Sequence, residues 1–89
     1  MPVPDDLRGR IARIVIDSAE GDLTPAELSA AGGSLAGVGY SSLSLIRMLD
    51  AIENETGVFI DPEEDGERVG SVDQLAELVG ERLAAVTGA

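Results

Sequence analysis

Apolar residues recur at every third or fourth position along three stretches of the chain, which is the spacing of one buried face of an α-helix. The stretches cover about residues 4–19, 42–56 and 71–83. The residues expected to face the core are Leu7, Ile11, Ile14 and Val15, then Leu45, Met48, Leu49 and Ile52, and finally Val72, Leu75, Ala76, Val79 and Leu83. Strand-like residues are confined to the run Val58-Phe59-Ile60, which is followed by Asp61-Pro62. The pattern therefore predicts an all-α fold.

Residues suited to helix ends flank the second of these stretches and precede the third. Ser41 is a good N-cap for a helix that begins at Ser42, because its hydroxyl can accept an otherwise unpaired backbone N–H. Gly57 can end that helix in the left-handed conformation. Ser71 followed by Gln74 has the spacing of a capping box and predicts the start of the last helix.

Shorter elements are predicted between the long helices. Residues 24–27 form a capping box with proline at the first helical position, and residues 61–64 repeat that pattern, so each predicts a short helix. The glycine-rich residues 32–39 predict a long loop, held to the core by Leu35 and Val38. Together the elements predict a small four-helix bundle with a long loop between its first two main helices and a short third helix.

Charge and composition limit the possible functions. The 89 residues suffice for one domain, with a core over about residues 4–84. Seventeen acidic residues oppose six arginines, giving a net charge of −11. Such a surface repels nucleic acid and attracts a partner protein with a basic patch.

No cysteine or histidine is present, so neither catalysis by the chain nor a metal site is expected. Because neither a leader peptide nor a bilayer-spanning run is apparent, we expect a cytoplasmic protein with no membrane partner. We also expect the protein to be a monomer.

The candidate chemistry lies where the glycine-rich loop meets the most apolar helix. The run there reads Gly39-Tyr40-Ser41-Ser42-Leu43. With Ser41 as the N-cap, Ser42 takes the first helical position and its hydroxyl is expected to point to water. Unpaired N–H groups and the helix dipole favour negative charge at such a position, which suits a phosphodiester.

This run, and the order of the elements around it, resembles the acyl carrier and peptidyl carrier protein family. The family signature is Gly-x-Asp-Ser-Leu at the start of the second helix, and the resemblance extends over about residues 23–83. It implies the carrier-protein fold and a 4'-phosphopantetheine arm, transferred from coenzyme A to Ser42 by a phosphopantetheinyl transferase. The arm would hold an acyl or aminoacyl group as a thioester and present it to loading and condensing enzymes.

The resemblance also implies a docking surface for these enzymes. Its residues are Ser41, Leu43, Ile46, Arg47, Asp50 and Glu53. Exposed aliphatic side chains beside charges suit a small, reversible interface. Two of the positions depart from the family: Ser41 replaces the signature aspartate, and Arg47 stands where an acid is common. The first departure implies slow loading or a dedicated transferase, and the second an unusual partner. Both favour polyketide or nonribosomal peptide synthesis over housekeeping fatty acid synthesis.

Several alternatives remain open from the sequence. Ser41 and Ser44 compete with Ser42 as the modified residue, and Tyr40 either contacts the arm or closes the loop. Residues 61–66 superficially resemble the start of a calcium-binding loop, but Val72 occupies the twelfth position, where a glutamate is required. The alternative function is an unmodified acidic helical adaptor that binds a basic protein.

Overall fold

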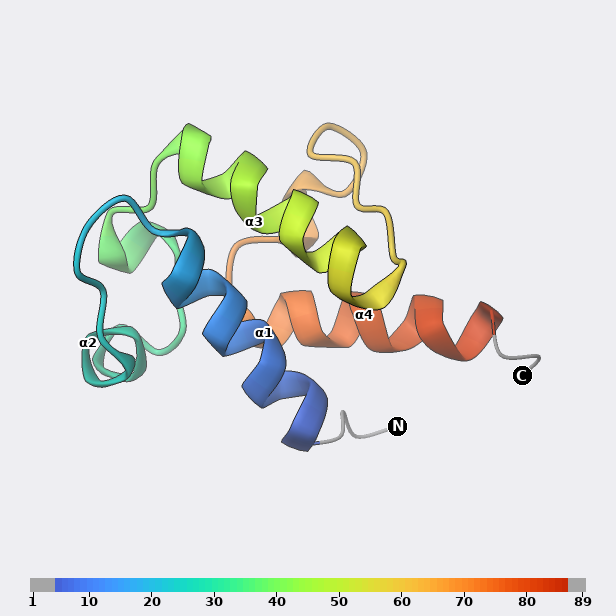
Figure 1. Ribbon diagram of the computed structural model, residues 1–89, viewed down its shortest axis with the longest axis horizontal. Helices are drawn as coiled ribbons and strands as arrows, with labels where there is room; N and C mark the ends of the chain where they lie inside the picture. Colours follow the sequence, from blue (N-terminus) through green and yellow to red (C-terminus); the bar gives the residue numbers. More distant parts are fainter. Residues whose placement is uncertain (1–4, 87–89) are drawn as a thin grey trace.

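The structure is a computed structural model that describes residues 5–86, and its three long helices follow the predicted order (Figure 1). The α-helices are α1 (Asp5–Ser18), α2 (Pro25–Ala30), α3 (Ser42–Thr56) and α4 (Val72–Val86), and two 3-10 turns, η1 (Ala36–Val38) and η2 (Gly66–Arg68), lie between them. Over residues 5–86 there is no strand, only an isolated antiparallel bridge between Ser34 and Ser71. The prediction of a small all-helical fold is therefore confirmed.

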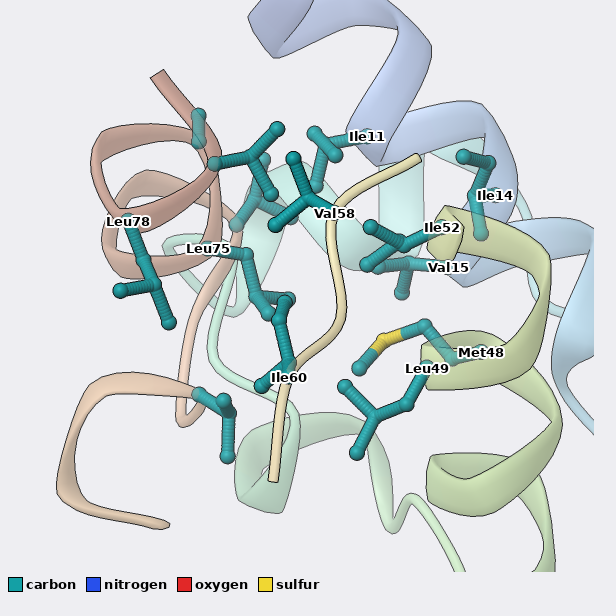
Figure 2. Packing of buried hydrophobic residues seen from close by; sticks show 14 of the residues in the cluster. Ile11, Ile14, Val15, Met48, Leu49, Ile52, Val58, Ile60, Leu75 and Leu78 are labelled. Carbon is teal, nitrogen blue, oxygen red and sulfur yellow. The ribbon is translucent and has the colours of Figure 1, made fainter. Parts of the chain in front are cut away.

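Helix α1 lies against both α3 and α4, and the three apolar stripes meet in one core. The segment after α3 enters this core rather than running over its surface: Val58 and Ile60 point into the cluster between α3 and α4 (Figure 2). Most predicted core residues are buried, whereas Leu45 and Leu83 are only partly so, and Leu78 is buried although it was not predicted. None of the helices described is both long and apolar enough to cross a bilayer.

The predicted caps are present at the starts of α2 and α4. The Thr24 hydroxyl accepts the N–H of Glu27, and the Glu27 carboxylate accepts the N–H of Thr24, each at 3.1 Å. The Ser71 hydroxyl accepts the N–H of Gln74 at 3.1 Å, but the Gln74 side chain donates to the Glu67 carbonyl instead of completing the box. The first capping box is thus confirmed in full and the second only in its Ser71 half.

The prediction of a short α-helix beginning at residues 61–64 is wrong. The Asp61 carboxylate does accept the N–H of Glu63 at 2.8 Å, as an N-cap would. However, the N–H of Asp61 donates to the carboxylate of Asp65, and only a turn forms before the 3-10 turn η2. The physical reason lies in α4: Arg82 donates to both carboxylate oxygens of Asp65, at 2.7 and 2.9 Å, and to the Phe59 carbonyl at 2.9 Å. These hydrogen bonds pair the Asp61 N–H, the Asp65 carboxylate and the Phe59 carbonyl, so the segment does not need to form a helix to satisfy them.

This ion pair should make the stability depend on pH. Hydrogen bonds from Arg82, followed by the Asp61 N–H, hold the pKa of Asp65 below its ordinary value. A lowered pKa in the folded state means that the stabilisation is complete above the ordinary pKa of aspartate, about 3.9, and is lost as the pH falls through the folded-state pKa. We expect Asp65→Asn to lower the free energy of unfolding by roughly 1 kcal/mol at pH 7, and by progressively less as the pH falls below about 3.9, in urea titrations.

Asp73→Asn is the matched control, because Asp73 pairs with Arg8 at 2.6 Å but keeps 66% of its side chain exposed, against 13% for Asp65. Exposed pairs contribute little to stability. An equal effect of the two substitutions at pH 7 would contradict a special role for the Asp65–Arg82 pair.

Candidate functional site

The loop that leads into α3 is joined to the start of α4 by two backbone hydrogen bonds. The N–H of Leu35 donates to the Gly70 carbonyl, and the N–H of Val72 donates to the Gly33 carbonyl, each at 3.0 Å. Gly39 then turns the chain into α3 with a φ of +69°, a conformation that favours glycine. These bonds join the long loop to the beginning of α4 and fix the position from which α3 emerges.

Tyr40 closes the loop rather than extending into solvent. It is half-buried, and its hydroxyl donates to the Val15 carbonyl of α1 at 2.8 Å. Burial raises the pKa of Tyr40 to about 12, opposed in part by the Ser18 hydroxyl. The sequence left two roles open for this residue, and the observed contact favours the loop-closing one.

The three candidate serines differ sharply in accessibility. Ser44 is buried, with 1% of its surface exposed. Ser41 is half-buried and is the N-cap, since its hydroxyl accepts the Ser44 N–H at 3.0 Å. Ser42 is exposed at the first position of α3, and within residues 5–86 its hydroxyl makes no hydrogen bond. Of the three hydroxyls, only that of Ser42 is both accessible and uncommitted.

The backbone around Ser42 suits an anion. Ser41 uses its hydroxyl for the Ser44 N–H and its carbonyl for the Leu45 N–H. The N–H groups of Ser42 and Leu43 have no partner in the described part of the chain. Two unpaired donors at the positive end of a 15-residue helix favour a negatively charged group beside the Ser42 oxygen.

A carboxylate from the α1–α2 connection lies next to Ser41, which the sequence did not predict. The Ser41 hydroxyl donates to Glu20, and Glu20, Asp22 and Glu27 line a hollow of about 400 Å³ that Ser41 and Tyr40 also border. A serine at position 41 can donate a hydrogen bond to Glu20, whereas an ionised aspartate could only repel it. The contact gives a physical reason for the departure at Ser41.

Substitutions at Ser41 should report on this contact. We expect Ser41→Ala to destabilise the protein by about 1 kcal/mol, because an N-cap is lost. Ser41→Asp keeps a capping oxygen but places it against Glu20, so Ser41→Asp should be less stable than the double variant with Glu20→Gln. Thermal unfolding of the wild type, Ser41→Asp, Glu20→Gln and the double variant measures the coupling between the two positions. If Ser41→Asp is equally stable with and without Glu20→Gln, the two side chains do not interact.

The remaining predicted docking residues lie together on the outer face of α3. Leu43, Ile46, Arg47, Asp50 and Glu53 are all exposed. Arg47 differs from the other five arginines, each of which bonds to a carboxylate or a carbonyl; Arg47 has no such partner in the described part of the chain. The structure therefore brings Ser42 and five of the six docking residues onto one accessible surface, while Ser41 is half-buried at its edge.

Residues 5–86 contain no arrangement of side chains suited to binding a metal ion. No group of three or more aspartate, glutamate, histidine or cysteine side chains is placed to hold an ion there. In the segment that resembles a calcium-binding loop, the Asp65 carboxylate is engaged by Arg82 instead.

Comparison of the chain with protein-family models, with curated proteins and with solved structures gave no match.

Proposed function

We propose that this protein is a carrier protein whose Ser42 bears a 4'-phosphopantetheine arm. The observation that carries the proposal is the accessible, uncommitted Ser42 hydroxyl beside two unpaired N–H groups at the start of α3. These features fit a phosphodiester at that oxygen. The run from Gly39 to Leu43 and its resemblance to carrier proteins supply the chemical identity of the group.

The covalent step is a group transfer to the Ser42 oxygen. This oxygen forms a bond to the β-phosphorus of coenzyme A and loses its proton, while the pyrophosphate bond breaks and adenosine 3',5'-bisphosphate leaves. A phosphopantetheinyl transferase would supply the catalytic groups, since the chain has no histidine or cysteine. When bound, the arm supplies the thiol that forms the thioester with an acyl or aminoacyl cargo. The protein contributes an exposed nucleophile on a fixed helix end.

The outer face of α3 is the proposed docking surface for the transferase and for the loading and condensing enzymes. Its exposed aliphatic residues can be buried reversibly, and Asp50 and Glu53 can attract a basic partner. Arg47 is free to select a partner that offers a carboxylate at the corresponding point. A tethered cargo then reaches each docked enzyme at high effective concentration. Polyketide or nonribosomal peptide synthesis is the proposed setting.

The test is intact-mass spectrometry of the protein after co-expression with a promiscuous phosphopantetheinyl transferase. We expect the mass to increase by one phosphopantetheinyl group, and peptide mapping to place it on Ser42. A correctly folded protein that gains no mass would contradict the proposal and leave the acidic adaptor that binds a basic protein.

A further inference from the structure

Phe59 is the most exposed large hydrophobic side chain in the described part of the chain, with 62% of its surface accessible. Its neighbours Val58 and Ile60 are both buried in the core between α3 and α4 (Figure 2). Burial alternates along this segment as it does in an extended strand, where successive side chains point in opposite directions. The packing of Val58 and Ile60 therefore forces Phe59 outward.

The backbone of Phe59 is also held by α4. Arg82 donates to the Phe59 carbonyl at 2.9 Å and, through the same guanidinium group, forms the ion pair with Asp65. An exposed aromatic side chain on a backbone that is fixed on both sides loses little conformational freedom when a partner covers it. Aromatic residues, phenylalanine included, are enriched at protein–protein interfaces relative to the rest of the surface.

Phe59 and α3 together form a small groove, which we call the Phe59 groove. It is lined by Ile46, Leu49, Asp50, Glu53, Phe59, Ile60 and Pro62. Its volume is about 110 Å³, well below the several hundred Å³ of a site for a small-molecule ligand. Ile46, which is 56% exposed, faces the same groove. The dimensions suit one protruding side chain of a partner protein.

The charges around the groove indicate which kind of partner fits. Asp50 and Glu53 line it, and neither forms an ion pair with any residue that the structure describes. No arginine lines the groove. A second copy of this chain is a poor occupant, because each copy carries a net charge of −11. A protein surface with an apolar side chain flanked by lysine or arginine matches both the shape and the charge.

We propose that the Phe59 groove binds an apolar side chain of a basic partner protein, with Phe59 as the principal contact. The inference deepens the proposed function, on which it rests for the partner's identity as an enzyme that acts on the cargo. It extends the docking surface from α3 to the segment after it, a part of the chain for which the sequence predicts no docking role.

The experiment is a fluorescence-anisotropy titration of a labelled amphipathic peptide, made only of leucine and lysine, with the unmodified protein. We expect saturable binding by the wild type at physiological salt. Phe59→Ala and Ile46→Ala should each weaken binding about tenfold, and the double variant little further, because both substitutions open the same groove. Ser29→Ala is the control: Ser29 is exposed on α2 and belongs neither to the groove nor to the docking residues of α3, so binding should hardly change.

Two charge reversals distinguish docking at the Phe59 groove from general electrostatic attraction between the peptide and the protein. Glu53→Lys and Asp17→Lys change the net charge equally, but only Glu53 lines the groove. We expect Glu53→Lys to weaken binding at least fivefold more than Asp17→Lys does. Three results would overturn the proposal: no peptide binding, equal effects of the two charge reversals, or self-association of the wild type that Phe59→Ala abolishes. Ser42→Ala should bind the peptide like the wild type, so failure of docking and failure of loading are distinguishable.

Discussion

Replacing Ser42 with alanine is expected to abolish the mass gain on incubation with coenzyme A and a phosphopantetheinyl transferase. The substitution removes the proposed nucleophilic oxygen and nothing else that the described part of the chain uses, since no hydrogen bond there involves that hydroxyl. The free energy of unfolding should therefore change by no more than about 0.5 kcal/mol. Intact-mass spectrometry measures the loading, and urea titration verifies that the variant is folded.

Three other serines provide controls for this experiment. Ser29 is exposed on α2, thirteen positions before Ser42, and Ser29→Ala should load like the wild type. Ser41→Ala and Ser44→Ala should still gain the full mass, although the first is expected to be less stable because it lacks the N-cap. Loading of Ser42→Ala at the wild-type rate would contradict the assignment of the modified residue.

The long helices could be predicted from the sequence because each is determined by a local, periodic signal. The stripe from Leu7 to Val15 and the cap at Ser41 depend on residues within a few turns of one another. The segment after α3 could not be predicted in the same way. Its conformation depends on Arg82 and Asp65, which are seventeen positions apart, and no local pattern indicates which carboxylate an arginine in a distant helix will choose.

The candidate site shows the same division between local and distant information. The exposure of Ser42 and the burial of Ser44 follow from their positions on one helix. The Glu20 contact joins residues twenty-one positions apart and left no signal in the sequence. Phe59 lies between these two cases. If Val58 and Ile60 are both assigned to the core, alternation along an extended segment places the Phe59 side chain on the surface. In our proposal the docking surface extends to this segment, which the sequence pattern indicates only as a connection between helices.

Replacing Ile52 with alanine is expected to have the largest effect on stability. Ile52 is fully buried on the inner face of α3, where it lies near Val15 of α1 and beside the segment that contains Val58 (Figure 2). Removing its outer methyl and methylene groups leaves a cavity at the meeting point of these elements, at a cost of about 2–5 kcal/mol. A domain of 89 residues has a total stability of only about 4–13 kcal/mol. The urea midpoint should therefore fall by about 2 M or more, or the variant should be partly unfolded without denaturant.

Two variants control for the position and the volume of the change at Ile52. Leu43→Ala removes an aliphatic side chain from the exposed face of the same helix and should cost less than about 1 kcal/mol, while Ile52→Val should cost about 0.5–1.5 kcal/mol. Because the proposed transferase recognises Ser42 on the folded α3, phosphopantetheine loading of Ile52→Ala should remain possible at a rate that follows its folded fraction. Equal stabilities of Ile52→Ala and Leu43→Ala would mean that the inner and outer faces of α3 are wrongly assigned, and the exposed position of Ser42 depends on that assignment.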